Sequence, residues 1–428
     1  MTNTSILLAS GMLLAAYLLD TLGRRFRLPS VVLLILTGLA MRQVLHHAGM
    51  ELDHMDEIVP ILGTIGLILI VLEGALDLEV TADRKRVIGL AALSSFLGIV
   101  VCAGAFTLLF AQVLGLSYPV ALTAAVPFAV ISSAVAIPSA AGLAAAPREF
   151  VIYESSFSDI LGVLVFYAAV TSRGSLSTFA VDLFGGGALS IAVALVASVA
   201  LYVLINKAEG HVRFLPLLAG LVCLYAIGKE LHLSPLIFVL VAGLVIGNPH
   251  LLDVVPRLKR VHSPDYDETV REFKGLVAEL TFAAKAFFFL LLGYWTDVEH
   301  LLRNPLAWAI AAAVVGFVFV SRRGLLRLLR IGDAAPLTWI APRGLITVLL
   351  FLAANEGGAL AAFPIGVLML TVLATSSLVA LAHQDRDGRK NALASAVDRR
   401  HAGVPAPRSS PATDLPAPDV APDAGPRV

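Results

Sequence analysis

Long apolar runs recur along the whole 428-residue chain, and they restrict its possible folds more than any other feature. A helix that crosses a membrane needs about 20 mostly apolar residues. Only 14% of the residues are charged, whereas soluble domains carry roughly 25%. The sequence therefore excludes a soluble enzyme, a disordered chain and a disulfide-stapled secreted fold. Windows of this length predict thirteen spans, at residues 5–22, 29–48, 58–77, 87–113, 117–146, 149–172, 182–206, 213–229, 232–248, 274–296, 304–321, 334–355 and 358–383.

Basic residues alternate in number between successive loops. Cytoplasmic loops of membrane proteins carry an excess of Lys and Arg. With the N-terminus outside, the inside loops hold 18 Lys and Arg and the outside loops hold 4. An extra or missing span would exchange inside and outside for every later loop, and the difference in Lys and Arg content would be lost. We therefore expect residues 1–383 to form a multi-pass domain of the inner, cytoplasmic membrane with its C-terminal end inside.

Residues 384–428 have a different composition from the rest of the chain. From Asn391 onward they contain seven of the 22 prolines. We expect this region to be a disordered cytoplasmic tail, because it has too little apolar surface to fold. The longest inside loop, 249–273, is mixed in charge and is expected to hold a short surface helix.

Other features of the composition exclude further classes. Lys plus Arg and Asp plus Glu number 31 each, so no basic excess suggests nucleic acid as a partner. Cys102 and Cys223 both lie in apolar runs and are expected to be packed thiols. The first apolar run lacks a basic N-terminal region, so we interpret it as a span and not as a signal peptide.

Ionisable residues inside the spans are functional candidates, because a charge at mid-membrane costs about 2.5–3.5 kcal/mol. The densest polar segment is 153–162. Its residues Ser155, Ser158, Asp159 and Gly162 recur at i, i+3, i+4 and i+7, which predicts one helix face. Glu154 lies about 140° around the helix from Asp159. We therefore expect Asp159 to face a small polar cavity and Glu154 to face a different neighbour.

Two predicted spans contain helix breakers. The fifth span holds Ser132, Ser133 and Pro138, and the twelfth holds Pro342. Proline removes a backbone hydrogen bond, and broken backbone at membrane depth must be covered by protein or water. A plain kink is the alternative for the fifth span. Because the two spans are seven apart, they run in opposite directions, as a transporter with inverted repeats requires.

Six segments resemble the monovalent cation:proton antiporter superfamily, the sodium/proton exchangers. They occur in the family's order, on a matching topology, and the resemblance covers roughly residues 8–383. The segments are Leu28-Pro29, 66–77, Glu154-Ser155 with Asp159, 243–248, 287–293 and Pro342-Arg343-Gly344.

The resemblance implies an all-α polytopic membrane protein of about 13 transmembrane helices, with inverted-topology repeats and two broken, crossing helices. It implies a homodimer in the lipid bilayer that exchanges Na⁺, Li⁺ or K⁺ for H⁺ by alternating access, without a cofactor. Protons and cations compete for one aspartate in this family, here Asp159. Removal from water favours the uncharged form of a carboxylate, which makes such competition possible. Hard oxygen ligands for the metal cation are expected from Ser132, Ser133, Ser155 and Ser158.

The resemblance also assigns charge-compensating residues. An Arg that closes the family's eleventh span pairs with its ion-site glutamate, which implies Glu154 with Arg322 or Arg323. Anchoring at the inner interface is the alternative for both arginines. Arg343 lies deeper and is expected to neutralise helix-dipole ends at the second break.

Two departures from the family's pattern bear on the site. Ser158 stands where the electroneutral branch has Asn and the electrogenic branch has Asp. Because serine carries no charge, we expect one proton per cation. Ser132-Ser133 stands where the family has Thr-Asp-Pro or Thr-Ser-Pro, so the group of this segment that touches the ion stays open.

Other assignments also stay open at this point. Glu73 and Lys285 are possible site residues, and Lys285 either faces Glu279 or extends to the membrane interface. A sodium-coupled organic-anion symporter on a related fold is one alternative function, and a non-transporting membrane sensor is another. A membrane enzyme is not expected, because the spans contain no hydrolase or protease motif.

Overall fold

The computed structural model describes most of the apolar part of the chain. The described residues are 2–26, 29–47, 55–78, 80, 84–172, 175–207, 214–231, 233, 235–254, 265–296, 303–332, 334–355, 358–360 and 363–382. The predicted tail, 384–428, lies outside these ranges.

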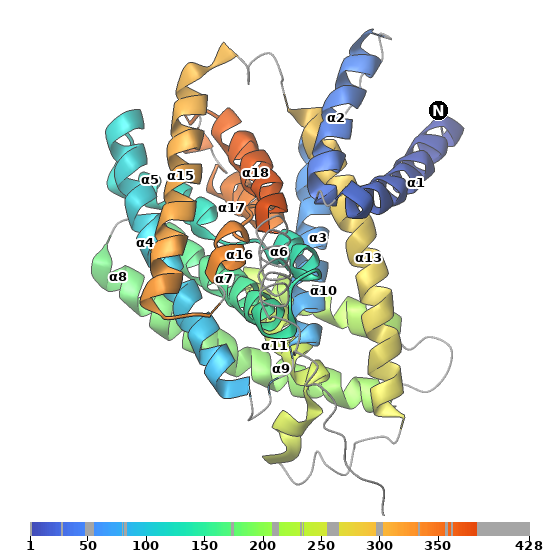
Figure 1. Cartoon of the computed structure of the whole chain (residues 1–428). Coiled ribbons are helices and arrows are strands. Elements are labelled where there is room, and N and C mark those ends of the chain that lie inside the picture. Colours follow the sequence, from blue (N-terminus) through green and yellow to red (C-terminus); the bar gives the residue numbers. More distant parts are fainter. Residues whose placement is uncertain are drawn as a thin grey trace, which may run out of the picture. The chain divides into compact units, whose positions relative to one another are not determined.

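The described residues form helices and connecting turns, and none of them forms a strand (Figure 1). The helices are α1 (Thr2–Phe26), α2 (Ser30–His47), α3 (Met55–Asp77), α4 (Lys85–Leu114), α5 (Tyr118–Ala129), α6 (Ser133–Ala140), α7 (Ala145–Ser172), α8 (Leu176–Val181), α9 (Gly187–Lys207), α10 (Phe214–Glu230), α11 (Pro235–Gly247), α13 (Tyr266–Trp295), α15 (Pro305–Leu328), α16 (Ala334–Trp339), α17 (Leu345–Ala354) and α18 (Gly366–Leu378).

Each of the thirteen apolar windows contains one helix or one broken pair of helices. The broken pairs are α5–α6 in the fifth window and α16–α17 in the twelfth. Within the described ranges, seven segments have the length and composition to cross a membrane, and shorter apolar helices such as α11 and α17 accompany them. The predicted number and order of the apolar helices therefore match the structure.

Some details differ from the sequence-based expectations. Helix α13 begins at Tyr266, so the loop is shorter than 249–273. Its described part holds a 3₁₀ helix, Pro249–Val254, and residues 255–264 of the loop lie outside the described ranges. Asp267 and Glu268 in the first turn of α13 favour this early start, because acidic residues stabilise a helix N-terminus. Cys102 is buried as expected, but Cys223 is exposed on α10.

Helix contacts divide the described chain into two groups (Figure 1). The panel group comprises α1, α2, α3, α9, α10, α11 and α13, in which α13 packs on α2 and α3, and α11 packs on α3, α9 and α10. The crossing group comprises α4–α7 and α15–α18, in which α4 packs on α5, α7 and α15. Helices α3 and α11 of the panel group also contact α7, which places α7 at the seam between the groups.

Glycines allow the panel helices to pack backbone to backbone. A Cβ atom added at Gly38 or Gly293 would collide with the backbone of the other helix in the α2–α13 pair. A Cβ at Gly247 would lie 2.7 Å from the Leu76 carbonyl oxygen of α3. The Asn248 side chain then joins the ends of α3 and α11, donating to the Leu78 carbonyl at 2.7 Å and accepting from the Val80 N–H at 2.8 Å. These contacts give a physical reason for the glycines of segments 243–248 and 287–293.

The two broken helices cross within the crossing group. The Ser132 N–H of the first break donates to the Pro342 carbonyl of the second at 2.9 Å. A Cβ at Gly344 would lie only 2.7 Å from Ser132 Oγ, so this position has no room for a side chain. Helix α4 contacts α5 and helix α15 contacts α16, so each half of the chain packs a long helix on its broken helix.

The first break lies at 130–132 and not at Pro138, which is inside α6. The reason is that the backbone donors there bond outside their own helix. The Ile131 N–H bonds to Ser158 Oγ at 2.9 Å, and the Ser132 N–H bonds to Pro342. Backbone polar groups at membrane depth need such partners, and side chains of α7 and backbone of the second break supply them.

Candidate functional site

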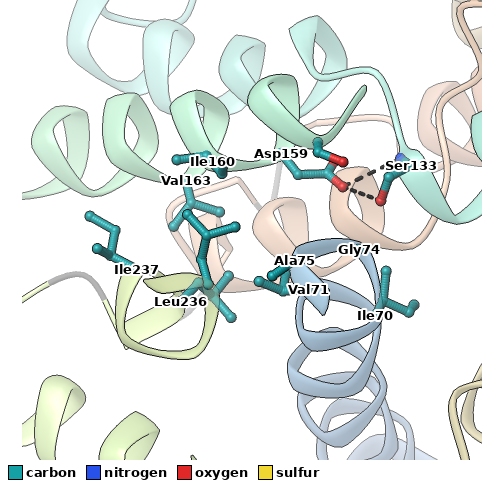
Figure 2. Close-up of a pocket in the computed structure, with 12 residues that line it drawn as sticks. Ile70, Val71, Gly74, Ala75, Ser133, Asp159, Ile160, Val163, Leu236 and Ile237 are labelled. Carbon is teal, nitrogen blue, oxygen red and sulfur yellow. Dashed lines mark hydrogen bonds between the residues drawn. The ribbon is translucent and has the colours of Figure 1, made fainter. Parts of the chain in front are cut away.

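Asp159 lies near the middle of α7, and its side chain is 6% exposed. One carboxylate oxygen, Oδ2, accepts hydrogen bonds from the Ser133 N–H at 3.3 Å and from the Ser133 hydroxyl (Figure 2). Ser133 is the first residue of α6. The carboxylate therefore lies at the positive end of the α6 dipole, a position that stabilises negative charge.

A small cavity of about 20 Å³ adjoins Asp159, which is room for about one water molecule. It lies at the seam between the two groups, with walls from α3, α6, α7 and α11. Figure 2 shows Val71 and Leu236 on the panel side and Ser133 on the crossing side. Of the described residues that line the cavity, Asp159 is the one carboxylate.

Two buried oxygens in this cavity are available to a ligand. Asp159 Oδ1 and Ser156 Oγ have no hydrogen-bond partner among the described residues. Unpaired buried polar atoms are costly, so they are uncommon in folded proteins. Gly74 of α3 leaves room beside Ser156, since a Cβ there would be 3.8 Å from Ser156 Oγ. The free oxygens, together with the size of the cavity, suit a small hard cation with few water ligands, or a proton on Asp159.

Ser156 was not predicted from the sequence, and the expected serines lie elsewhere. Ser155 Oγ donates to the Val151 carbonyl of its own helix at 2.8 Å, and Ser158 Oγ accepts from Ile131. Neither lines the Asp159 cavity. This corrects the expectation that these serines share one cavity with Asp159.

The physical reason is that the small-residue stripe of α7 is used for packing. Gly162 lies against Val130, where any Cβ would collide with the valine side chain. Ser158 Oγ accepts a hydrogen bond from the N–H of Ile131, the residue after Val130 in the first break. Small side chains let the broken backbone approach α7, and the cavity forms on the neighbouring stripe. Ser132 likewise packs against Gly344 and does not line the cavity.

Arg343 donates hydrogen bonds to the carbonyl ends of the broken helices. Its guanidinium donates to the carbonyls of Phe128 and Ala129, where α5 ends, at 2.7 and 3.3 Å. It also donates to the Ala341 carbonyl beyond the end of α16, at 2.9 Å. The residue is 1% exposed. The crossing thus combines a carboxylate at the start of α6 with a cation where α5 and α16 end.

Glu154 pairs with Arg322 on the other side of α7. Two N–H groups of Arg322 meet the two carboxylate oxygens at 3.0 and 2.8 Å, and both side chains are buried. Ser94 Oγ also donates to Glu154 at 2.6 Å. Arg323 is exposed, so the structure distinguishes the two arginines that the sequence left as alternatives.

Glu73 and Lys285 pair with each other. The Lys285 ammonium lies 3.2 Å from the Glu73 carboxylate and joins α13 to α3. The expectation that Lys285 faces Glu279 or extends to the interface is therefore corrected. Both residues lie within apolar helices, so each provides the other with a countercharge. Neither lines the Asp159 cavity.

Comparisons with known proteins agree with this arrangement. The family profile described as "Sodium/hydrogen exchanger, transmembrane" matches residues 10–383. A structure of the sodium proton antiporter MjNhaP1 from Methanocaldococcus jannaschii at pH 8 has a TM-score of 0.69 with this chain at 22% identity, covering 89% of this chain and 96% of that one. An electron-microscopy map of the same antiporter gives a TM-score of 0.68 at 22% identity, covering 92% and 97%. No curated protein sequence matches the chain.

The structural matches and the profile match support different conclusions. Similarity of structure at 22% identity shows a shared fold. The profile match, in contrast, extends over nearly the whole apolar part of the sequence. The chain therefore belongs to the sodium/hydrogen exchanger family of multi-pass membrane transporters.

Proposed function

We propose that this protein exchanges a monovalent cation, Na⁺, Li⁺ or K⁺, for protons, and that Asp159 binds the two in turn. The single observation that carries the proposal is the unpaired Asp159 Oδ1 in a cavity with room for about one water molecule. A proton on Asp159 removes the charge that holds the cation, and a bound cation opposes protonation. Mutual exclusion at one carboxylate is sufficient to couple the two fluxes.

The cation ligands in this proposal are Asp159 and two serine hydroxyls, those of Ser133 and Ser156. Ser133 already contacts Asp159, and Ser156 Oγ faces the same cavity without a partner among the described residues. Ser158 and Ser132 have a supporting role, because Ser158 Oγ accepts from the Ile131 N–H of the first break and the Ser132 N–H donates to the Pro342 carbonyl of the second. Ser155 bonds to a carbonyl of its own helix. Hard oxygen donors of this kind suit alkali cations.

Exchange of one proton for one cation is the stoichiometry we propose. Asp159 is the one carboxylate among the described residues of the cavity. Glu154 is held by both of its oxygens to Arg322, so its charge is already balanced. Ser158 adds no charge. Binding and release at this site then move one positive charge in each direction, and the cycle is electroneutral.

Alternating access at the seam completes the proposal. The cavity has walls from both helix groups, so a displacement of one group relative to the other would open it first to one side and then to the other. We further propose an inner-membrane homodimer with the N-terminus outside, in which the panel group forms the dimer contact, as the family resemblance implies.

The test is a proteoliposome assay of pH change on addition of Na⁺, Li⁺ or K⁺, with and without an ionophore that clamps the voltage. We expect exchange by the wild type and none by Asp159→Asn, because the amide cannot bind and release a proton. Glu149→Gln is the matched control. It also replaces a carboxylate of α7 by its amide, but Glu149 belongs to a partly exposed ion pair with Arg84.

The outcome separates the proposal from its alternatives. Wild-type exchange rates in Asp159→Asn would rule out this carboxylate as the carrier. Absence of exchange with every cation in a folded wild-type protein would favour a non-transporting sensor. Uptake of an organic anion with Na⁺ would favour a symporter, which a cavity of about 20 Å³ does not accommodate.

A further inference from the structure

A second cavity, of about 200 Å³, lies behind the crossing. Its walls come from α4 and α15, and its floor includes the broken backbone at Ala129, Ile131 and Ala341. We call it the rear cavity. It shares no lining residue with the Asp159 cavity. On α7 it borders Glu154 and Ser158, which lie about 140° and about 100° around the helix from Asp159.

The rear cavity contains an excess of buried positive charge. Arg322, Arg343 and Glu154 line it, and each is at most 6% exposed. Two guanidinium groups and one carboxylate give a net charge of +1. The carbonyl groups that accept from the arginines carry dipoles but no net charge, so they do not cancel this excess. A buried unbalanced charge attracts a counterion strongly, because the local dielectric constant is low.

Donors for a counterion are present. A guanidinium has five N–H groups. Arg322 uses three of them, on Glu154 and the Leu337 carbonyl, and Arg343 uses three, on the carbonyls at the crossing. Two N–H groups of each arginine therefore remain without a partner among the described residues. Glu154, in contrast, already accepts from Arg322 and Ser94, so the cavity offers more donors than acceptors.

The entrance to the rear cavity is apolar. Val101 of α4 and Leu328 of α15 line it and are exposed, and Leu325 lies between the two helices. Phe96 and Val100 continue this exposed apolar surface along α4. In a membrane-spanning protein such a surface faces the acyl chains of lipids. A ligand that enters here must therefore be soluble in the membrane.

We propose that the rear cavity binds a single-chain fatty acid. Its carboxylate lies against Arg322 and Arg343, and its alkyl chain leaves between α4 and α15. An amine would be repelled by two guanidiniums, and an uncharged chain would leave their N–H groups unpaired. A diacyl phospholipid keeps its headgroup at the membrane surface, so it does not bring its charge to a floor at the depth of the crossing.

Cys102 provides a direct test, because it lines the rear cavity and lies 3.6 Å from Ser321 Oγ. The chain has two cysteines, so Cys223→Ser leaves Cys102 as the one thiol. The full-length protein in phosphatidylcholine nanodiscs is labelled with methyl methanethiosulfonate and followed by intact mass. The additions are decanoate, decanol or decylamine, and a separate arm replaces part of the lipid with phosphatidylglycerol.

Decanoate should slow the labelling of Cys102. At ten times its dissociation constant only about a tenth of the cavities are empty, so labelling should slow about tenfold. Decanol, decylamine and phosphatidylglycerol should leave the rate nearly unchanged. Equal protection by decanol would show simple filling of an apolar space. Protection by phosphatidylglycerol alone would assign the site to a diacyl lipid, and no protection by decanoate would reject the proposal.

The second measurement is decanoate binding to variants in which a larger side chain fills the rear cavity. Gly324 lines the rear cavity and has open space around its Cβ position, so Gly324→Leu should occupy it without a clash. Gly316→Leu is the control, because Gly316 lies on the same helix, also in open space, and does not line the cavity. Binding of radiolabelled decanoate to the purified proteins should fall at least about tenfold in Gly324→Leu and stay unchanged in Gly316→Leu.

Gly98→Leu fills the same cavity from α4 and keeps the test available if Gly324→Leu does not fold. Decanoate binding that persists in a folded, filled variant would place the fatty acid elsewhere. This inference does not depend on the proposed exchange activity, since every readout is binding or labelling.

Discussion

Two adjacent stripes of α7 have different roles. On the stripe of Ser155, Ser158 and Gly162, the last two residues pack against the first break, and the stripe of Ser156 and Asp159 borders the cavity at the seam. A rotation of the helix by about 100°, one residue, would exchange these roles. Which side chains of α7 face the cavity, and so which are the proposed cation ligands, therefore depends on how α7 is turned, and the packing of small residues fixes that rotation.

Ser156→Ala should weaken cation binding without destabilising the fold. Its hydroxyl has no partner among the described residues, so its removal breaks no hydrogen bond there. Loss of one oxygen ligand should cost about 0.5–1.5 kcal/mol, or roughly 2- to 10-fold in the apparent affinity for the cation. Ser155→Ala, one residue away, should leave the affinity unchanged. Cation dependence of exchange in proteoliposomes measures both, and a reversed order would place the ion on the packing stripe.

Glu154→Gln should lower thermal stability more than it changes cation affinity. Its partner Arg322 would remain buried without a countercharge, which costs about 3–5 kcal/mol. The double variant with Arg322→Met should recover part of the loss, because the stranded charge of Arg322 is then removed as well. Arg323→Met serves as the control, since Arg323 is exposed. An unchanged melting temperature together with a large loss of affinity would mean that Glu154 binds the ion directly.

Sequence alone could identify the important residue types but not their partners. Asp159, Glu154 and Arg343 stand out because charge is rare inside spans. The choice of Arg322 over Arg323, and the pairing of Glu73 with Lys285 across 212 residues, follow from tertiary packing. Ser156 has no local signal, because its role comes from the orientation of α7 and from the space beside Gly74.

At the scale of elements, glycine contacts fix the panel group. Gly293→Ala should destabilise the protein by about 1–3 kcal/mol, because the new Cβ would collide with the Ile35 carbonyl of α2 and push the helices apart. Gly275→Ala on the same helix has open space and should be neutral or slightly stabilising, since alanine favours helix. Thermal unfolding in detergent compares the two variants. Equal melting temperatures would show that α2 and α13 can separate at little cost.

The number and order of the helices were the features that the sequence predicted best. Apolar length and basic loops are signals along the chain, so all thirteen windows contain helices. The position of the first break was less predictable. Pro138 is visible in the sequence but lies inside α6, while the break at 130–132 depends on acceptors supplied by Ser158 and Pro342.

For the whole molecule, competition at one site predicts a bell-shaped dependence of exchange on pH. At low pH protons occupy Asp159, and at high pH too few protons are available to complete the cycle. Raising the cation concentration should move the acid limb to lower pH, because more protons are then needed to displace the cation. Exchange rates in proteoliposomes over a grid of pH and cation concentration test this. An acid limb that stays fixed would contradict competition.

Truncation after Lys390 should leave this pH profile unchanged. The removed residues lie outside the described ranges, and their sequence has no apolar periodicity that would dock on the membrane domain. Full-length and truncated proteins are compared in the same vesicles, at equal amounts of inserted protein. A shifted profile in the truncated protein would assign pH regulation to the tail.

Arg343 has a consequence for the order in which the chain matures during synthesis. Its carbonyl partners at the end of α5 precede it by 215 and 214 residues. A helix carrying this charge and a broken backbone is poorly soluble in lipid by itself. The segment from α16 to α17 should therefore stay with the insertion machinery until it docks on α5. Newly made chains that lack an intact α5 should release this segment into the bilayer poorly, and quality-control proteases would degrade them.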